Sequence, residues 1–198
     1  MPQPVIYYIR HGETEWNALG RFQGSQDIPL NDLGRRQAVA AGAILQRILG
    51  DGAANGALPF VASPLGRARQ TMELLRGVLD LPPHGYAVDD RLREIHYGRW
   101  EGSTLSAMRA SDPDIFSARE RDIWCVPPPG GESYAAVTTR MHDWYRSLAG
   151  DTVAVAHGGT ARALLVALGI KSPDDVADLA IEQGVVYVFA DGSWTKHV

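Results

Sequence analysis

Short apolar runs alternate with amphipathic stretches along most of this chain. The run 5–9 lacks polar alternation, which predicts a strand buried on both faces, as in a parallel sheet. Further runs of strand character lie at 59–62, 152–156 and 185–189. The last of these is followed by Asp191-Gly192 and then by 193–196, an arrangement that predicts a hairpin near the end of the chain.

Between these runs, apolar residues recur at helical spacing. Asn31 is a suitable N-cap for the first helix, and Ser63 followed by Pro64 predicts the start of the second. The predicted helices cover 31–49, 63–79, 132–148 and the stretch from the end of the third strand to about 168. This alternation of strands and helices predicts an α/β fold, with three α/β/α layers and a mostly parallel central sheet.

Two stretches break the alternation. Glycine-rich 50–56 predicts a loop. Turn signals such as Asp112-Pro113 and the run 127–131 make the middle of the chain irregular. We therefore expect a single domain over 1–198, in which about 95–131 forms a cap-like insertion over the sheet.

Composition narrows the class of protein. The chain has 198 residues, of which 45% are hydrophobic, and its formal net charge is −4. Proteins that bind nucleic acid usually carry a basic surplus, so that role is disfavoured. No apolar run approaches the roughly 18 residues of a membrane-spanning helix, and the first residues do not resemble a signal peptide. Because Cys125 is the single cysteine, no internal disulfide is expected, and we predict a cytoplasmic protein.

Two of the predicted strands end in a histidine followed by glycine. The first leads into Arg10-His11-Gly12 and the third into His157-Gly158-Gly159. Ligands of open α/β sheets bind at the carboxyl ends of strands, and a helix N-terminus there suits an anion. One such pair alone is more typical of a structural loop histidine. The repetition, with Arg10 beside one of them, favours a shared anion site.

Arginines lie near the start of the helix predicted after the second strand. Cations are disfavoured at a helix N-terminus, so Arg67 there indicates an anion between the helix end and the guanidinium. The alternative is a solvated basic helix face. We expect that alternative for Arg69 more than for Arg67.

The segment Arg10–Asn17 reads R-H-G-E-T-E-W-N and resembles the R-H-G-E-[ST]-x-W-N signature of the histidine phosphatase superfamily, the phosphoglycerate mutase-like enzymes. The resemblance continues in family order over nearly the whole chain. Its further blocks are Gln23-Gly24, Pro29-Leu30, Gly34, Gln37-Ala38, 63–71, 92–102, 129–133 and 157–159. One such triplet would be weak, but the full ordered set is highly specific.

The resemblance implies a role for each matching residue. His11 would be the nucleophile that takes the phosphoryl group, and Glu94 the proton donor. Arg10, Arg67 and His157 would surround the transferring group. The substrate-binding residues would be Asn17, Thr14, Gln23, Gly24 and Gly158. Taken alone, Glu94 is more typical of a surface ion-pair partner of Arg93.

No metal or cofactor is expected, because arginines and imidazoles can stabilise phosphoryl transfer without one and no cluster has metal-ligand spacing. The partner would be a small phosphorylated metabolite such as a sugar phosphate, phosphoserine, α-ribazole phosphate or a phosphoglycerate. Neither nucleic acid nor a membrane is expected as a partner, and a homodimer stays open.

The family contains phosphatases and mutases. Mutases of this family typically have Arg after the glutamate and Ser at the position of Thr14, whereas Ile95 follows Glu94 here and the insertion is compact. These features favour a phosphatase, a metal-independent phosphomonoester hydrolase acting through a phosphohistidine. The alternative is a phosphoglycerate mutase, for which arginines of the insertion could bind a second anionic group: Arg109, Arg119 and Arg121. A non-catalytic phosphate-binding protein is less favoured.

Several residues stay unassigned from sequence. Arg162 fits either an approach to the site or an anchor for its helix, and we place it outside the catalytic set. Four aromatic residues fit either the mouth of a pocket or the core: Trp100, Phe116, Trp124 and Tyr134.

Overall fold

A mixed sheet runs through the centre of the computed structural model, which describes residues 3–50 and 58–198. The described strands lie in the order β3-β2-β4-β1-β5-β6. Their bounds are β1 Ile6–Arg10, β2 Phe60–Ala62, β3 Ala87–Val88, β4 Thr152–Ala156, β5 Val186–Ala190 and β6 Ser193–His197. Neighbours from β3 to β1 pair in parallel, whereas β5 is antiparallel to both β1 and β6. The mostly parallel sheet and the terminal hairpin are thus confirmed.

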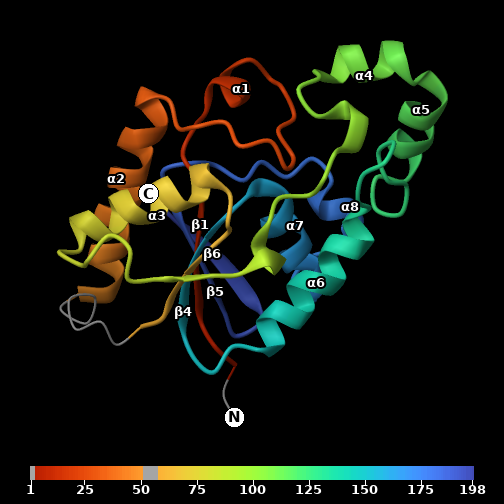
Figure 1. Cartoon of the computed structure of the whole chain (residues 1–198). Coiled ribbons are helices and arrows are strands. Elements are labelled where there is room, and N and C mark those ends of the chain that lie inside the picture. Colours follow the sequence, from red (N-terminus) through yellow and green to blue (C-terminus); the bar gives the residue numbers. More distant parts are fainter. Residues whose placement is uncertain (1–2, 51–57) are drawn as a thin grey trace.

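Helices cover both faces of this sheet (Figure 1). On one face α2 packs against α3, and on the other α6 packs against α7. The described α-helices are α1 Glu15–Ala18, α2 Asp32–Leu49, α3 Gly66–Val78, α4 Leu105–Ser111, α5 Pro113–Arg121, α6 Tyr134–Arg146, α7 Gly158–Ala167 and α8 Pro173–Val176. The predicted three-layer α/β/α architecture is confirmed.

Strand β1 shows why the central strands lack polar alternation. Ile6 and Tyr8 belong to the hydrophobic cluster beneath α6 and α7, while Ile9 belongs to the cluster beneath α2 and α3. Successive side chains of a strand point to opposite faces, so a sheet covered on both sides needs apolar residues at adjacent positions.

The second predicted helix begins later than the sequence pattern indicates. Helix α3 starts at Gly66, and Ser63 is not its N-cap. Instead, Ser63 N donates to Val155 O and extends the ladder beside β4, while the Ser63 hydroxyl lies 2.7 Å from His157 Nε2. The orphan amide at the start of α3 is capped from a distant segment, because Gly66 N donates to Asp27 Oδ1 at 2.8 Å.

The middle of the chain carries more regular structure than its composition indicates. It contains the 3-10 turn η3 (Gly98–Trp100) as well as α4 and α5, and the 3-10 turn η2 (Asp90–Leu92) precedes it. Figure 1 places α1, α4 and α5 at the end of the molecule toward which β1 runs. The loop predicted at 50–56 begins at Gly50, the C-cap of α2, and its remainder lies outside the described residues. In the described part of the chain, no helix combines the length and the apolarity needed to span a bilayer.

Candidate active site

The parallel pairing of β1 with β4 brings the two histidines together. Arg10 lies opposite Ala156 in the register, and His11 N donates to Ala156 O at 2.9 Å. The residue that follows β4 is His157. Its ring centroid lies 5.1 Å from that of His11, in an edge-to-face arrangement. The expectation that both strand ends meet at one place is confirmed.

Two contacts fix the proton of the His11 ring. Nδ1 lies 2.7 Å from Gly12 O, and Nε2 lies 3.3 Å from Arg67 Nε. A carbonyl oxygen can only accept and a guanidinium can only donate, so the proton is on Nδ1 and the lone pair on Nε2. Burial, together with the charges of Arg67 and Arg10, holds the pKa of His11 well below its ordinary value. The ring is therefore neutral at pH 7, with an unprotonated Nε2.

Arg67 lies in the first turn of α3 and is almost fully buried. Besides its contact with His11, it donates to Gln26 O at 2.6 Å and to Gly24 O at 2.8 Å. Burial lowers the pKa of Arg67 to about 10, so the side chain stays cationic at neutral pH. These bonds hold the guanidinium plane beside His11 Nε2.

Arg10 supplies a second guanidinium from the end of β1. Its Nη1 donates to Ile181 O at 2.6 Å, whereas its buried Nε has no hydrogen-bond partner among the described residues. Burial lowers the pKa of Arg10. A buried donor without an acceptor costs about 1–3 kcal/mol, so this atom favours an anionic ligand.

His157 lies behind His11 and is fully buried. Its Nε2 contacts Ser63 Oγ, and its Nδ1 has no partner among the described residues. Burial, together with the charge of Arg67, holds the pKa of His157 well below its ordinary value.

The position of Glu94 depends on a glycine at the start of α7. Its carboxylate oxygens accept hydrogen bonds from Ile95 N at 2.9 Å and Gly159 N at 3.2 Å. A Cβ at Gly159 would lie 2.4 Å from Glu94 Oε1, so a larger residue would displace the carboxylate. The alternative of an ion pair with Arg93 is wrong, because Arg93 pairs with Asp90 at 3.0 Å.

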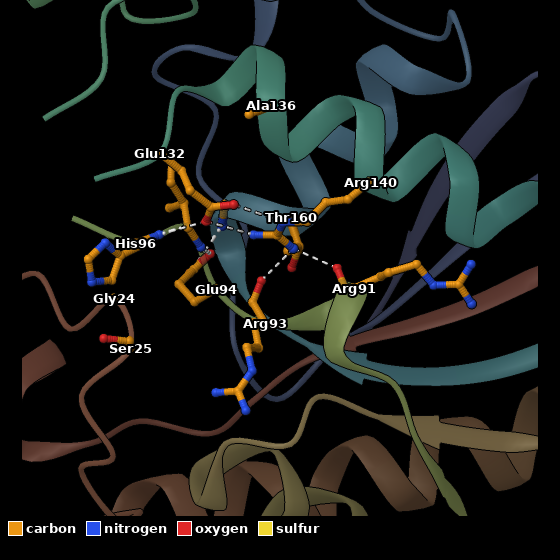
Figure 2. Close-up of polar contacts among 12 residues, drawn as sticks. Gly24, Ser25, Arg91, Arg93, Glu94, His96, Glu132, Ala136, Arg140 and Thr160 are labelled. Atoms are coloured by element: carbon orange, nitrogen blue, oxygen red, sulfur yellow. Dashed lines mark hydrogen bonds and ion pairs between the residues drawn. The ribbon is translucent and has the colours of Figure 1, made fainter. Parts of the chain in front are cut away.

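Arg140, on α6, donates hydrogen bonds to the backbone just before Glu94. The sequence analysis did not identify this residue. Figure 2 shows its guanidinium between the carbonyl groups of Arg91 and Arg93 and the carboxylate of Glu132. Glu132 in turn accepts from His96 N at 3.0 Å. A lone arginine on an amphipathic helix carries no sequence signal for such a role.

Thr14 and Asn17 form a capping box at the start of α1. Asn17 Oδ1 accepts from Thr14 N and from Gln183 Nε2, each at 3.2 Å. Because its oxygen is engaged by these donors, the amide nitrogen of Asn17 is left to face the cavity. Thr14 is fully buried and acts as the N-cap of α1.

A cavity of about 220 Å³ contains most of these groups. It is lined by Arg10, His11, Asn17, Gly20, Arg21, Phe22, Gln23, Gly24, Arg67, Glu94, Tyr97, Gly158, Gly159, Arg162 and Ile181. Thr14 and His157 lie behind this wall. Arg162, which the sequence analysis placed outside the catalytic set, is part of it. The lining includes four arginines and one carboxylate, so the cavity suits an anion.

The three insertion arginines considered for a second anionic group do not line this cavity. Arg109 pairs with Glu120 at 2.8 Å, Arg119 donates to Val126 O at 2.6 Å, and Arg121 is exposed. Within residues 3–50 and 58–198, no group of three or more His, Cys, Asp or Glu side chains could hold a metal ion.

An uncharged imidazole nitrogen in contact with Arg67, with Arg10 in the same cavity wall, suits phosphoryl transfer to nitrogen. A family model described as histidine phosphatase superfamily (branch 1) matches residues 6–196, and the chain belongs to this superfamily of phosphatases and phosphoglycerate mutases. The resemblance found in the sequence is therefore confirmed.

The similar proteins include both phosphatases and mutases. The chain is 39% identical over 178 residues to the glucosyl-3-phosphoglycerate phosphatase of Mycolicibacterium vanbaalenii, covering 82% of this chain and 73% of that protein. It is 32% identical over 205 residues to the 2,3-bisphosphoglycerate-dependent phosphoglycerate mutase 2 of Gloeobacter violaceus, covering 97% and 89%. A solved mycobacterial glucosyl-3-phosphoglycerate phosphatase, in complex with VO3, matches with a TM-score of 0.74 and 33% identity over 98% of this chain and 92% of that one.

Proposed function

We propose that this protein is a metal-independent phosphomonoester hydrolase that acts on a small phosphorylated metabolite through a phosphohistidine. The carrying observation is His11 Nε2, which bears a lone pair and lies 3.3 Å from Arg67 Nε. The Nε of Arg10, which has no partner in the described part of the chain, supports the same assignment from the end of β1. The cavity of about 220 Å³ suits a small substrate.

The first half of the reaction moves the phosphoryl group to the enzyme. Glu94 takes up a proton as the phosphate dianion binds beside it. His11 Nε2 then attacks phosphorus, the bond from phosphorus to the ester oxygen breaks, and Glu94 gives this proton to the leaving oxygen. Arg10 and Arg67 stabilise the charge on the transferring oxygens. The carbonyl oxygen of Gly12 accepts the hydrogen bond from His11 Nδ1 while the ring carries the phosphoryl group.

The second half returns the enzyme to its starting state. Glu94, now a carboxylate, takes a proton from water as the water oxygen attacks phosphorus, and the bond to Nε2 breaks. Phosphate leaves and Glu94 again holds the proton. Asn17, Gln23, Gly24 and Gly158 would bind the substrate at the cavity wall, while Thr14 would fix Asn17 and His157 would support His11 from behind.

Hydrolysis is favoured over the mutase reaction by what the cavity lacks. Its wall does not include Arg109, Arg119 or Arg121, the insertion arginines that could bind a second phosphoryl group. Ile95, the residue after Glu94, is fully buried and apolar. The mutase remains the second candidate because the chain also resembles 2,3-bisphosphoglycerate-dependent mutases. A non-catalytic phosphate-binding protein is less favoured, since every group needed for turnover is present.

The decisive experiment is an assay of released phosphate over a panel of phosphomonoesters, with and without 2,3-bisphosphoglycerate. We expect release of phosphate without that compound. Conversion of 3-phosphoglycerate to its 2-isomer, dependent on 2,3-bisphosphoglycerate and without phosphate release, would identify a mutase instead.

The organisation of the chain is part of the proposal. Residues 95–131 would act as a cap within one domain spanning 1–198, because Tyr97 already lines the cavity. We propose a cytoplasmic protein without a nucleic-acid or membrane partner, in line with its net charge of −4. A molar mass measured by light scattering would test whether the protein forms a homodimer in solution.

A further inference from the structure

Glu101 carries a nearly buried carboxylate that the proposed chemistry leaves without a role. Its side chain is 6% exposed. Oε1 accepts hydrogen bonds from Ser25 N at 2.8 Å and Tyr97 N at 3.2 Å, and Oε2 accepts one from Gln26 Nε2 at 2.9 Å. Burial raises the pKa of Glu101, but hydrogen bonds from Ser25 and Gln26 outweigh this effect and lower the pKa overall. The side chain is therefore ionised at neutral pH.

Most of these donors come from one turn, 23–26, which Gln26 N closes by donating to Gln23 O at 3.0 Å. In the described part of the chain, no arginine or lysine forms an ion pair with Glu101, and His96 Nε2 lies 3.6 Å from its Oε1. A carboxylate removed from water needs hydrogen bonds in place of its hydration, and here the turn supplies them. These contacts fix the turn against Glu101.

One peptide unit of the turn lies between Glu101 and Arg67. The C=O of Gly24 and the N–H of Ser25 belong to the same planar unit and point in opposite directions. Ser25 N donates to Glu101 Oε1, while Gly24 O accepts from Arg67 Nη2 at 2.8 Å. Rotation of this unit would break both hydrogen bonds together. Glu101 therefore decides where an acceptor of Arg67 lies.

Gln26 makes a second connection between the same two side chains. Its amide nitrogen donates to Glu101 Oε2, and its backbone oxygen accepts from Arg67 Nη1 at 2.6 Å. Both terminal nitrogens of the guanidinium thus bind carbonyl groups of the turn that Glu101 holds. The remaining nitrogen, Nε, lies 3.3 Å from His11 Nε2. The turn therefore sets the plane of the guanidinium beside His11.

Gly24 permits the close approach of Glu101 to the turn. Its φ of +54° is a conformation that favours glycine, and a Cβ there would lie 2.1 Å from Glu101 Oε1. A side chain at this position would push the carboxylate away from Ser25. The glycine and the glutamate thus serve one contact, although they lie far apart in the chain.

We propose that Glu101 is a positioning residue for Arg67, because it holds the turn that fixes the guanidinium against His11 and the transferring phosphoryl group. Glu101 is not part of the cavity wall, so it would act through Arg67 alone. Donors stabilise the charge of a transition state best when they are already aimed at it. The inference rests on the proposed function, since phosphoryl transfer is the step that an aligned Arg67 would accelerate.

The contact with Tyr97 N offers a different role for Glu101, support of the segment that carries Glu94. The leaving group of the substrate separates the two roles. A misaligned Arg67 should slow the hydrolysis of p-nitrophenyl phosphate and of glycerol 3-phosphate alike, because both transfer the same phosphoryl group. A misplaced Glu94 should slow mainly glycerol 3-phosphate, because p-nitrophenolate leaves without needing a proton.

Glu101→Ala should lower kcat about 10-fold or more for both esters with a smaller change in KM, because hydrogen bonds to a charged group are lost and alignment matters most in the transition state. Glu101→Gln keeps an oxygen that can accept from Ser25 N and should restore part of the rate. Gln26→Ala, at an exposed residue, removes one connection without disturbing the buried carboxylate and should give a smaller loss of the same kind. Glu120→Ala is the matched control, since this carboxylate lies in α5 and pairs with Arg109.

Nuclear magnetic resonance gives a reading without turnover. The Nε–H signal of Arg67, identified by its absence in Arg67→Lys, should exchange slowly with solvent in the wild type and in Glu120→Ala. It should exchange faster in Glu101→Ala and in Gln26→Ala. Unchanged exchange in both of these variants would overturn the inference, and so would a loss of kcat confined to glycerol 3-phosphate. A wild-type protein that hydrolyses neither ester would contradict the proposed function, while the exchange rates would still decide whether Glu101 positions Arg67.

Discussion

The state of one imidazole ring decides the chemistry proposed for this site. His11 donates from Nδ1 to Gly12 O and accepts at Nε2 from Arg67. In the proposed mechanism, Arg67 would thereby orient the nucleophile as well as the phosphoryl oxygens. A lysine at that position could not donate to His11, Gln26 and Gly24 in one plane.

Replacing His11 should remove the covalent intermediate. Brief reaction of the wild-type protein with a labelled phosphomonoester should leave an acid-labile, base-stable label on the chain. In His11→Ala the label and the turnover should both disappear, because no other imidazole lines the cavity within the described residues. Circular dichroism should show retained secondary structure, and persistence of the label in this variant would refute the mechanism.

The two buried histidines also predict how stability depends on pH. Their pKa values lie well below 6.5 in the folded protein, so between that value and the folded pKa the unfolded chain binds more protons. The free energy of unfolding should therefore fall as pH drops below about 6.5, by about 1.4 kcal/mol per pH unit for each histidine.

Urea unfolding at pH 5.5 and pH 7.5 measures this dependence. His157→Gln should show a smaller difference between the two pH values than the wild type. His84→Gln is the control, since the His84 side chain is 76% exposed. A wild-type protein equally stable at both pH values would contradict the assignment of neutral buried rings.

At the scale of elements, the segment 179–183 holds three polar side chains of the cavity. Leu179 O accepts from Arg162, Ile181 O accepts from Arg10, and Gln183 donates to Asn17. Alternate residues of one irregular segment thus orient groups that come from α7, β1 and α1. Because only one of these contacts uses a side chain of the segment, sequence patterns could not reveal it.

Gln183 should act on turnover through Asn17. Gln183→Ala leaves Asn17 Oδ1 with fewer donors, so the amide should lose its fixed orientation and kcat should fall by about 3- to 10-fold, as expected for one hydrogen bond. In an Asn17→Ala background the same substitution should have no further effect. Glu182→Gln, at the neighbouring exposed residue that pairs with Lys196, is the control. Independent, additive losses in the double variant would show that Gln183 does not act through Asn17.

Elements also show where sequence reasoning succeeds and where it fails. The strands β1 and β4 were predictable because both faces are buried, and their parallel pairing then places His11 beside His157. The start of α3 was not predictable, because Asp27 caps this helix from another segment. Ser63 contacts His157 instead of capping the helix. Strand β3 was missed as well, since it has only two residues, both exposed, which are too few to form a periodic pattern.

The same limit applies to the site. Residues delivered by strand ends and helix starts carry a local signal, as Arg10 and Arg67 do. Arg140 and Gln183 act through hydrogen bonds to residues far away in sequence, which leave no periodicity. Arg162 could be read from sequence only as an approach to the site or a helix anchor, and its position in the cavity wall depends on the packing of α7.

For the whole molecule, charge is distributed unevenly. The chain carries a net charge of −4, yet the cavity beside His11 is lined by four arginines and a single carboxylate. A negative surface repels anions weakly at physiological salt, because charges beyond about 8 Å are screened. The cavity therefore retains a local preference for anions that the net charge conceals.

Inorganic phosphate should stabilise the folded protein through this cavity. A ligand that binds only the folded state raises stability by RT ln(1 + [L]/Kd), about 2.7 kcal/mol at a concentration 100 times Kd. Thermal unfolding of the wild type should shift upward with phosphate, whereas Arg10→Gln should show a much smaller shift, because Arg10 Nε is a buried donor without an acceptor in residues 3–50 and 58–198. The shift and the turnover should both survive prior treatment with EDTA, since arginine side chains, in place of a metal ion, would neutralise the phosphate. Arg121→Gln, on the exposed end of α5, should respond to phosphate as the wild type does. Loss of the shift or of turnover after EDTA would assign the anion site to a metal and contradict the arginine-based mechanism.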